Sequence, residues 1–542
     1  MANQSLPQEP AHPDHARETD SIYSRAGVVT FFTLLSRILG LARDLVISHK
    51  FGAGAASDAW VQAFRIPNAL RRLTAEGAMT IAFVPVYVEV KEKEGLAAAQ
   101  AFSRRVLGIV LTITLLLCAG GMVFSDGLTQ LFSPGFAADP EKFQLTSNLI
   151  RWSFPYLVLV SLVAWAMGLL NSEHYFAAPA AAPIFLNLGI IVAVVWFASR
   201  FSQPILAVAF GVLAGGVAQV ALQLPSLRKT GVRPLPLGGW RHPHMKKLMG
   251  LLVPSLVGVA VYQVNIILLG IIASFLPTGQ IFHYNNATRM TELVLGLFAF
   301  SFTTAGLPTL SRHQANQDWP RMAQTLRLTF SAVMFMILPA MAGLTAAGLP
   351  IAMLYLHGQY HYADVVRTAN TLIFMVLGMP AVALVRVMVP AYFAIGDART
   401  PVKVAGATLL VTAGASWFLS RSMEVEGLAL GLSLGVWFQC LGLALVLRKK
   451  TDRLKHWFPW DSIIRQGVSA LVVGALAYGL SQFGDWSLGG GSIWNWGILI
   501  FLVLASIGVY LGLNLILGEP EAANWVKLAG RAKGKLTRHH HP

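Results

Sequence analysis

Apolar stretches long enough to cross a lipid bilayer recur along this chain and exclude most other kinds of fold. About 20 apolar residues are needed to span roughly 30 Å of hydrocarbon. Fourteen such windows lie at 26–48, 57–89, 106–132, 146–170, 181–199, 204–225, 246–275, 281–308, 325–349, 369–395, 402–420, 425–447, 465–483 and 493–517. Only 12% of the 542 residues are charged, against about 25% in a soluble domain. The sequence therefore predicts an all-α polytopic membrane protein with about 14 transmembrane helices.

The basic residues between these windows are distributed unevenly, which predicts the orientation. With the amino terminus in the cytoplasm, the inside segments hold 28 Lys and Arg residues, whereas the outside segments hold five: Lys50, Lys142, Arg200, Arg367 and Arg421. Lys and Arg gather in cytoplasmic loops, so we expect both termini in the cytoplasm. The net charge of +16 then reflects topology and anionic lipid contacts, and nucleic acid is not an expected partner.

Landmark residues recur at an offset of about 223 positions, which indicates an internal repeat. The matched pairs are Phe51 with Phe275, Arg65 with Arg289, Pro85 with Pro308, Pro155 with Pro380, and Pro179 with Pro401. Two six-helix lobes follow. Because six is even, the lobes share one orientation and are related by a pseudo-twofold axis along the membrane normal. The alternative is a chance match, since Pro and Gly are common in membrane helices.

This organisation divides the chain into six segments. Residues 1–25 are polar and lack the apolar core of a signal sequence, so we expect a disordered cytoplasmic tail. The remaining segments are an N-lobe at 26–228, a basic cytoplasmic linker at 229–245, a C-lobe at 246–450, two appended helices at 451–518 and a basic cytoplasmic tail at 519–542. His539 to His541, whether native or a tag remnant, carry no functional argument.

Eight arginines lie inside the apolar windows: Arg37, Arg43, Arg65, Arg71, Arg72, Arg151, Arg289 and Arg386. A guanidinium group at the bilayer centre costs about 2.5–3.5 kcal/mol on insertion scales, so it faces a wet cavity or a partner. Because Arg keeps its charge and presents a planar fork that matches phosphate oxygens, the cluster predicts an anion site within the membrane. The alternative is structural ion pairing or snorkelling to an interface. Snorkelling is preferred for Arg72, Arg151 and Arg386.

Acidic neighbours predict how some of these arginines are held. Arg37 and Asp44 are seven residues apart and share one face of a helix, while Arg43 points about 120° away. Gly40 lies between them and permits close approach of another helix. We expect Arg37 and Asp44 to neutralise each other in part.

Three further acids complete the predicted charged constellation. Asp58 lies near the outer end of window 57–89, where Arg65 and Arg72 share one helix face and Glu76 is the nearby counter-charge. Glu292 follows Arg289 by three residues, a helical spacing at which the two side chains meet. Arginines still outnumber the plausible internal acids, so the surplus charge is positive.

No pattern of catalytic or metal-binding residues accompanies the arginines. The chain contains no P-loop and no GxGxxG motif, so we expect neither nucleotide binding nor an enzyme. His283, His357 and His361 lack metal-ligand spacing, and "HGQYHY" is expected in a solvated external loop. Cys118 and Cys440 lie in apolar runs and are expected to behave as small buried hydrophobes. The sequence predicts a transporter without metal or cofactor.

Residues 36–87, "SRILGLARDLVISHKFGAGAASDAWVQAFRIPNALRRLTAEGAMTIAFVPVY", resemble the MurJ/MviN family, the bacterial lipid II flippases of the multidrug/oligosaccharidyl-lipid/polysaccharide exporter superfamily. "GLLNSEHYFAAPAAAPIFLN" and "AYFAIGDARTPVKV" are also similar to segments of that family. The resemblance implies that lipid II moves from the inner to the outer leaflet of the bacterial cytoplasmic (inner) membrane. It also implies that the two appended helices form a groove for the undecaprenyl tail. By motif, the family's cavity charges correspond to Arg37, Arg43, Asp44, Asp58, Arg71, Glu76 and Arg289.

Physical reasoning agrees with this expectation. Lipid II carries a diphosphate, and moving negative charge outward across a membrane that is negative inside gains about 2.3 kcal/mol per charge per 100 mV. Sodium coupling through carboxylates of the seventh and eleventh helices, reported for some relatives, is not expected, because 246–275 and 402–420 contain no Asp or Glu. Membrane lipids and cell-wall synthases are candidate partners.

Other functions remain open at this point. The chain would also suit a flippase for another polyprenyl-diphosphate-linked saccharide or a multidrug exporter of the same superfamily. A membrane glycosyltransferase would need an acidic catalytic pair or a large external domain, and neither is visible. A scaffold for cell-wall enzymes has no need of buried arginines.

Overall fold

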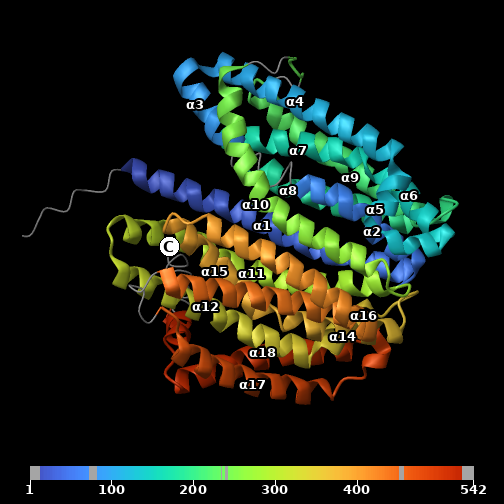
Figure 1. Ribbon diagram of the computed structural model, residues 1–542, viewed down its shortest axis with the longest axis vertical. Coiled ribbons are helices and arrows are strands. Elements are labelled where there is room, and N and C mark those ends of the chain that lie inside the picture. Colours follow the sequence, from blue (N-terminus) through green and yellow to red (C-terminus); the bar gives the residue numbers. More distant parts are fainter. Residues whose placement is uncertain (1–12, 73–81, 233–234, 239–241, 451–456, 528–542) are drawn as a thin grey trace, which may run out of the picture. The chain divides into compact units, whose positions relative to one another are not determined.

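The computed structural model describes residues 13–72, 82–232, 235–238, 242–450 and 457–527, and these residues contain helices but no strand (Figure 1). The α-helices are α1 (Pro13–Phe51), α2 (Ala55–Arg71), α3 (Val84–Glu94), α4 (Leu96–Val123), α5 (Ser125–Phe132), α6 (Pro140–Ser153), α7 (Pro155–Ser172), α8 (Ala177–Phe197), α9 (Leu206–Lys229), α10 (Pro243–Ala273), α11 (Gln280–Ala315), α12 (Trp319–Ala346), α13 (Gly348–Ala352), α14 (Tyr362–Val376), α15 (Met379–Ala394), α16 (Arg399–Lys450), α17 (Trp460–Ser481) and α18 (Ile493–Ile516). The predicted all-α class is confirmed.

The membrane-spanning character of the helices can be judged by length and composition. Among the described residues, eight helices are long and apolar enough to cross a membrane, or nine if the bent pair α14 and α15 forms one span. One of the eight, α16, contains two of the predicted windows. The chain is therefore a multi-pass membrane protein, while the number fourteen stays a prediction.

The chain divides into two compact units. Unit 1 comprises Met1–Val46, Ala63–Ser125 and Ser147–Ala260, and unit 2 comprises Ile47–Gln62, Asp126–Thr146 and Val261–Pro542. This division differs from the predicted lobes at 26–228 and 246–450, because two segments of the first half group with unit 2. Hydrogen bonds explain the grouping, since Asp58 and Gln62 bind backbone groups of Gly279 and Gly270.

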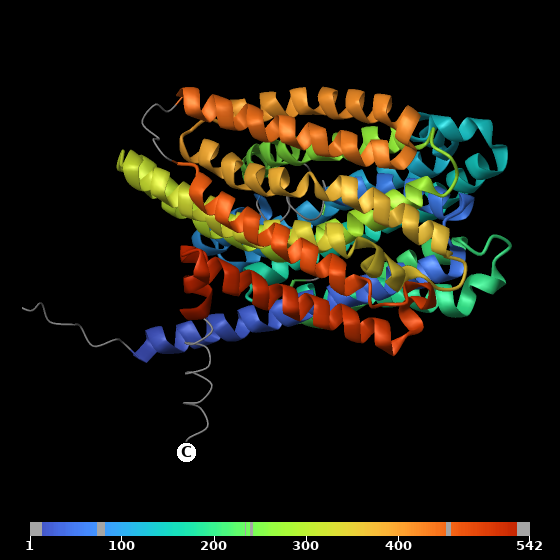
Figure 2. The ribbon, with the colours of Figure 1, turned by 90° about the horizontal axis from the view of Figure 1, so that it is seen from below.

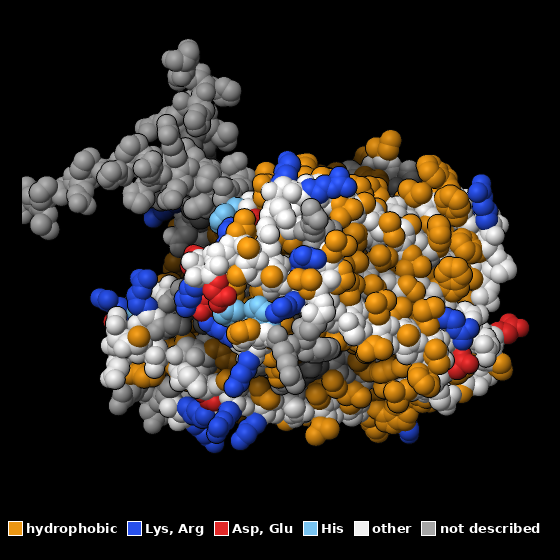
Figure 3. Space-filling view, turned by 90° about the horizontal axis from the view of Figure 1, so that it is seen from above, with side chains coloured by type: hydrophobic (Ala, Val, Ile, Leu, Met, Phe, Trp, Pro, Cys, Tyr) orange, Lys and Arg blue, Asp and Glu red, His pale blue; other side chains and the backbone are white. Residues whose placement is uncertain are grey.

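Unit 1 has an aromatic core between α3, α4 and α7. Phe83, Tyr87, Phe102 and Trp165 are fully or almost fully buried there. The indole Nε1 of Trp165 donates a hydrogen bond to the carbonyl oxygen of Ser103 at 3.0 Å. On the outside of α4, large apolar side chains are exposed, and hydrophobic side chains cover much of the face shown in Figure 3. Such a surface suits lipid contact.

Glycines bring α8 and α9 of unit 1 into backbone contact. A Cβ atom added to Gly189 would lie 2.7 Å from Cα of Gly215, and one added to Gly211 would lie 2.7 Å from Cα of Ile190. Real Cβ atoms do not approach so closely, so only glycine fits. Small residues at such crossings are the usual means by which membrane helices pack.

In unit 2, α16 is folded back on itself at Glu424. This residue has φ 52° and ψ −126°, which breaks the helix. Gly427 and Gly431 allow the two arms to touch, because added Cβ atoms would lie within 2.4 Å of Leu419 O and Ser416 N. The two arms correspond to the predicted windows 402–420 and 425–447.

The appended helices of unit 2 pack on α12. Helix α17 contacts both α12 and α18, and α17 lies alongside α18 in both ribbon views (Figures 1 and 2). Phe335 of α12 packs against Val473 of α17 and Tyr510 of α18. Their outer faces expose large apolar side chains such as Leu471 and Phe501.

Two of the three proline pairs of the predicted repeat occupy matching places in local structure, whereas in the third Pro85 is the second residue of α3 and Pro308 lies inside α11. Pro155 is the first residue of α7 and Pro380 is the second of α15. Pro179 and Pro401 each lie in the first turn of their helices, α8 and α16. Proline is well tolerated there, because the first N–H groups of a helix have no partner within the helix.

Two predicted tails contain ordered residues. Helix α1 begins at Pro13, so residues 13–25 are helical where a disordered tail was expected. Residues 520–527, which lie in the predicted basic tail at 519–542, are helical as well, and Glu519 and Ala522 are buried. In the second case the reason is that the chain turns back after α18 and packs onto unit 2.

Candidate functional site

Arg43 is held by two side chains in unit 1. Its Nε and Nη2 atoms donate to Oδ1 of Asp44 at 2.9 and 2.6 Å, and Nη1 donates to Oδ1 of Asn187 at 3.1 Å. Asn187 on α8 is fixed in turn, because its Nδ2 donates to the carbonyl oxygen of Ser36 at 3.0 Å. The guanidinium group is therefore oriented from both α1 and α8.

This geometry leaves Arg43 with donors for a ligand. A guanidinium group has five N–H donors, and three of those on Arg43 are directed at Asp44 and Asn187. The other two lie on Nη1 and Nη2, the atoms that typically bind a phosphate in a bidentate manner. The side chains of Arg43 and Asp44 are 18% and 12% exposed. Arg43 thus combines a fixed orientation with access from outside the unit.

Gly40 of α1 faces Asn187 of α8, but the spacing of the two helices does not require a glycine here. A Cβ atom on Gly40 would lie 3.7 Å from Nδ2 of Asn187. That is ordinary van der Waals contact, and a longer side chain would press on the amide that holds Arg43.

Two other candidates of unit 1 lie on α1 and α2. Arg37 is half-buried on α1. Arg71, the last residue of α2, donates from Nε to Oδ1 of Asn68 at 3.0 Å. Glu76 lies outside the described residues, so its role as a counter-charge stays a prediction. Asp44 forms an ion pair with the adjacent residue, Arg43, and the predicted partial neutralisation of Arg37 by Asp44 stays a prediction.

Arg289 and Glu292 form the predicted pair on α11 of unit 2. Nη1 of Arg289 lies 3.6 Å from Oε2 of Glu292, and their side chains are 39% and 40% exposed. A pair this open to solvent contributes little to stability. It orients the guanidinium group while leaving it accessible.

Asp58 lies in a buried ion pair of unit 2. Its Oδ2 accepts from Nζ of Lys142 at 2.9 Å, and neither side chain is more than 4% exposed. The backbone N–H groups of Gly279 and Phe282 donate to the same carboxylate at 2.7 and 3.0 Å. Asp58 thus caps the start of α11, where the helix dipole favours negative charge. We call Asp58, Lys142, Gly279 and Phe282 the Asp58 clasp.

The clasp changes the interpretation of Asp58. The sequence placed Asp58 among the substrate-contacting charges, but in unit 2 its oxygens accept from Lys142 and from the start of α11 and are shielded from solvent. Lys142 was missed as a functional residue. The available signal was its rarity, because it is one of only five basic residues in the predicted outer segments.

Further contacts of unit 2 lie beside the clasp. Nε2 of Gln62 donates to the carbonyl oxygen of Gly270 at 2.8 Å, and the backbone N–H of Gly135 donates to Ser274 Oγ at 3.1 Å. The N–H of Gln359 donates to the carbonyl oxygen of His49 at 2.9 Å. His49, Gly135 and Gln359 belong to segments that the charge bias assigns to the outer side, and Gln62, Gly270 and Ser274 lie near the outer ends of the windows 57–89 and 246–275.

The "HGQYHY" segment is less solvated than expected. Tyr360 is 1% exposed, and its hydroxyl lies 3.1 Å from Nδ1 of His283, which is also 3.1 Å from Oγ1 of Thr368. His361 forms a capping box with Asp364 at the start of α14. The expectation of a solvated loop is wrong for Tyr360, because its ring packs against Phe282 of α11.

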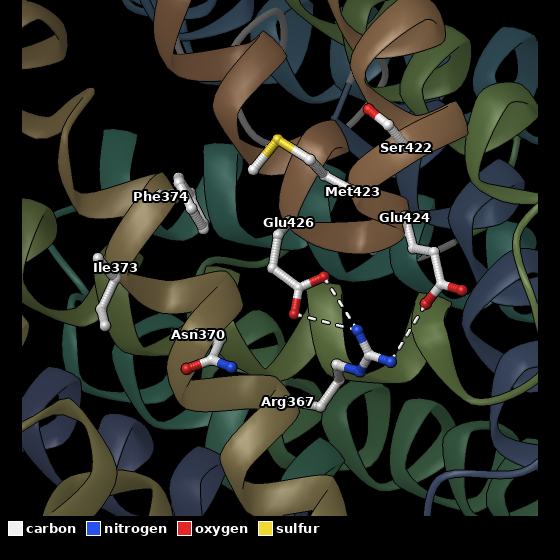
Figure 4. A pocket seen from close by; sticks show the side chains of 8 residues that line it. All are labelled: Arg367, Asn370, Ile373, Phe374, Ser422, Met423, Glu424 and Glu426. Atoms are coloured by element: carbon white, nitrogen blue, oxygen red, sulfur yellow. Dashed lines mark hydrogen bonds and ion pairs between the residues drawn. The ribbon is translucent and has the colours of Figure 1, made fainter.

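A cavity of about 670 Å³ opens in unit 2 between α14 and the bend of α16 (Figure 4). Arg367 points between two carboxylates there, with Nη2 3.3 Å from Glu424 and Nη1 3.3 Å from Glu426. Gln280 accepts a hydrogen bond from the N–H of Val425 at 2.9 Å and holds the bend. Because carboxylates outnumber cations in this cavity, it does not suit a diphosphate.

The remaining arginines of the predicted cluster differ in exposure. Arg65, Arg72 and Arg386 are half-buried, whereas Arg151 is exposed. Nη2 of Arg151 donates to Ser125 Oγ at 2.9 Å, which fits the preferred interpretation of a surface side chain.

Among the described residues, no group of three or more His, Cys, Asp or Glu side chains is arranged to hold a metal ion.

Comparison with known proteins gives consistent results. A family model described as "Lipid II flippase MurJ" matches residues 47–493. The probable lipid II flippase MurJ of Vibrio cholerae is 33% identical over 516 residues, covering 91% of this chain and 95% of that protein. The corresponding protein of Haemophilus influenzae is 36% identical over 386 residues, covering 69% and 76%.

Solved structures are similar as well. A structure titled "Lipid II flippase MurJ, inward closed conformation" is 25% identical, has a TM-score of 0.75 and covers 90% of this chain and 98% of its own. An inward-facing multidrug transporter of the MATE family, 13% identical with a TM-score of 0.67, covers 79% of this chain and 99% of its own and shares the fold.

Proposed function

Because the chain belongs to the MurJ family of lipid II flippases, we propose that it moves lipid II from the inner to the outer leaflet of the bacterial cytoplasmic membrane by alternating access. The observation that carries this proposal is the family match over residues 47–493. Both termini lie in the cytoplasm, as the distribution of 28 inner and five outer basic residues favours. The protein is a transporter and catalyses no covalent step.

The diphosphate of the substrate is bound by arginines. In unit 1, Arg43 supplies a fork already oriented by Asp44 and Asn187. In unit 2, Arg289 offers a separate guanidinium group that is accessible to solvent. Charge-assisted hydrogen bonds of this kind are worth about 1.5–3 kcal/mol each. Arg37, on the same helix as Arg43, and Arg71 on α2 add positive charge in unit 1, as expected from their motif.

The Asp58 clasp closes the outer side. In the proposed orientation it joins the outer ends of α2, α6 and α11, and the neighbouring bonds of Gln62 and Gln359 reinforce it. Release of the substrate to the outer leaflet requires these contacts to break. The membrane potential drives the step, since each negative charge moved outward gains about 2.3 kcal/mol per 100 mV.

The undecaprenyl tail travels along the appended helices α17 and α18. Their exposed faces carry large apolar side chains such as Ile464, Leu471, Phe501 and Leu504. A hydrocarbon tail placed there stays in an apolar environment while the polar headgroup crosses. Cell-wall synthases, which use lipid II on the outer side, are the partners we propose.

The test is a leaflet-specific measurement of lipid II in cells depleted of this protein and supplied with plasmid copies. The wild-type protein is expected to restore lipid II in the outer leaflet. Arg43→Ala is expected to leave lipid II on the inner side, whereas Asp461→Asn, at an exposed position of α17, behaves as wild type. Accumulation of a different lipid-linked saccharide on depletion would assign the protein to that substrate instead.

A further inference from the structure

The cavity between α14 and the bend of α16 takes no part in the transport steps proposed above. Its volume of about 670 Å³ lies within the range of about 300–1,000 Å³ that is typical of small-molecule sites. The lining residues lie at 367–374 and 422–426, at the outer ends of the predicted windows. In the proposed orientation the cavity therefore opens to the outer aqueous phase.

Three residues on one face of α14 form the first wall of the cavity. Arg367, Asn370 and Phe374 are spaced three and four residues apart, so their side chains follow one another along the helix (Figure 4). Arg367 and Asn370 are exposed, and Phe374 is half-buried. This wall offers a guanidinium group, an amide and an aromatic ring to one ligand.

The bend of α16 forms the second wall and is held in one conformation. Glu424 has φ 52°, a left-handed conformation that residues other than glycine rarely adopt. The side chain of Gln280 fixes it, because Oε1 accepts from the N–H of Val425 at 2.9 Å and Nε2 donates to Oε2 of Glu424. Backbone conformations of this kind are frequent at ligand sites. The carboxylates of Glu424 and Glu426 thus line the cavity from a fixed backbone.

The charged groups of the cavity pair with one another, but these pairs do not use all of their hydrogen-bonding positions. Nη1 of Arg367 donates to both oxygens of Glu426 at 3.3 and 3.4 Å, and Nη2 lies 3.3 Å from Oε2 of Glu424. A carboxylate has about four lone-pair positions, and a guanidinium group has five N–H donors. The contacts of Gln280 and Arg367 both reach Oε2 of Glu424, so Oε1 can accept from a ligand.

This chemistry suits a neutral ligand with several hydroxyl groups better than an ion. A cation would have to displace Arg367 from between the two carboxylates, and an anion would lie against those carboxylates. Hydroxyl groups donate to carboxylate and amide oxygens and accept from N–H groups, so they add bonds without breaking the existing pairs. The C–H face of a sugar ring also packs well on an aromatic ring such as that of Phe374.

From this geometry we propose that the cavity binds a neutral saccharide from the outer aqueous phase. Glu424, Glu426 and Asn370 bind its hydroxyl groups, and Phe374 packs against one sugar ring. The saccharide belongs either to the headgroup of a lipid-linked substrate or to a soluble glycan fragment, since both present the same hydroxyl groups. Only the first source rests on the proposed transport of lipid II, and binding of a free saccharide does not depend on it.

The test is isothermal titration calorimetry of the purified full-length protein in nanodiscs of zwitterionic phospholipid. Nanodiscs are used because a detergent with a maltoside headgroup would itself compete for a saccharide site. The probes are maltose and N,N′-diacetylchitobiose, with lysine amide as a cationic comparison. We expect saturable binding of at least one disaccharide and weaker or no binding of lysine amide.

Variants assign the binding to the cavity. Asn370→Ala removes an exposed amide and is expected to weaken disaccharide binding about fivefold. Phe374→Leu keeps an apolar side chain but removes the aromatic face, and a loss of about fivefold is expected here too. Phe483→Ala is the matched control, because this ring lies after α17, outside the cavity, and is 72% exposed. It is expected to bind as the wild type does.

Competition identifies the source of the saccharide. Wild-type nanodiscs are titrated with the disaccharide in the presence and absence of lipid II. Weaker disaccharide binding in the presence of lipid II assigns the cavity to the lipid-linked headgroup. Unchanged binding assigns it to a soluble glycan fragment. Either result supports a saccharide site, and neither one decides whether the protein transports lipid II.

Two results would overturn the proposal. One is a wild-type protein that binds neither disaccharide in a saturable manner, or that binds lysine amide more tightly, which would make the ligand a cation. The other is disaccharide binding that is unchanged in both Asn370→Ala and Phe374→Leu, which would place the bound saccharide elsewhere on the protein.

Discussion

The carboxylate of Asp58 accepts a hydrogen bond from Nζ of Lys142 at 2.9 Å, and the two side chains are 0% and 4% exposed. The residues are 84 positions apart in the chain. Lys142 also lies 4.3 Å from the centre of the Phe136 ring. A charged pair removed from water this completely holds together only while both partners are present.

Removal of either partner of this pair is expected to destabilise the protein strongly. Asp58→Ala or Lys142→Ala leaves an isolated buried charge, which costs about 3–5 kcal/mol. The double variant Asp58→Ala/Lys142→Ala is expected to lose much less than the sum of the two, because no charge is stranded. Free energies of unfolding for the four proteins of this cycle provide the measurement. Additive losses would show that the pair is not coupled.

Asn187 is expected to act as a positioning residue for Arg43. Asn187→Leu keeps the volume but removes the acceptor for Nη1 of Arg43, which is 3.1 Å away. Since a hydrogen bond to a charged group is worth about 1.5–3 kcal/mol, we expect lipid II transport to fall about tenfold or more while the amount of protein in the membrane is unchanged.

Arg43→Lys tests whether transport needs only the positive charge of Arg43 or also the planar shape of its guanidinium group. Lysine keeps the positive charge but lacks the planar fork, so it is not expected to replace arginine. Transport rates in cells, divided by the protein level, test both variants. A wild-type rate in Arg43→Lys would mean that charge alone suffices and that the orientation by Asn187 is unimportant.

Two glycine substitutions are expected to act in opposite directions. Gly211→Ala puts a Cβ atom 2.7 Å from Cα of Ile190 and forces α8 and α9 apart, at about 1–3 kcal/mol. Gly414→Ala on α16 meets nothing within 4 Å and gains helix propensity, so it is neutral or stabilising by up to about 1 kcal/mol. Unfolding midpoints compare them directly. Equal effects would contradict the close packing of α8 and α9.

Asp397, in the loop between α15 and α16, is expected to make stability depend on acid pH. Burial raises the pKa of its carboxyl, but hydrogen bonds from Lys450 at 2.5 Å and from the N–H of Thr400 at 3.0 Å outweigh burial and hold the pKa well below its ordinary value. A carboxyl with a lowered pKa in the folded state stabilises the protein above its unfolded pKa of about 3.9, and this stabilisation is lost as the pH falls further.

Lys450→Met removes the larger of these interactions. The variant is therefore expected to be less stable than the wild type at pH 6 and to lose less stability when the pH is lowered below about 4. Unfolding midpoints over this range provide the measurement. Parallel pH curves for the two proteins would show that the Lys450 contact does not set the pKa of Asp397.

Local features of the site could be predicted from the sequence. The spacing of Arg289 and Glu292 predicted their pairing, and the repeat matched Pro155 with Pro380, which both lie at the beginning of a helix. These depend on the helical period and on the backbone chemistry of proline, which act over a few residues. The length and hydropathy of the windows predicted the all-helical class.

Tertiary partners could not be predicted. Arg43 and Asn187 are 144 residues apart, and the sequence around either residue does not indicate the other as its hydrogen-bond partner. The same holds for Lys142, which looks like a solvated loop residue until α6 is placed beside Asp58. Buried polar contacts of this kind depend on the packing of whole helices, so their discovery required the structure.

Binding of lipid II to the purified protein tests most directly whether the guanidinium groups of Arg43 and Arg289 bind the diphosphate. The comparison is between lipid II and an analogue with the same sugar and peptide on a single phosphate, for the wild type, Arg43→Ala, Arg289→Ala and Asp461→Asn. The account predicts that wild type and Asp461→Asn bind lipid II about tenfold or more tightly than the analogue, a difference of about 1.4 kcal/mol, and that Arg43→Ala and Arg289→Ala lose most of this preference. Equal discrimination in all four proteins would contradict it.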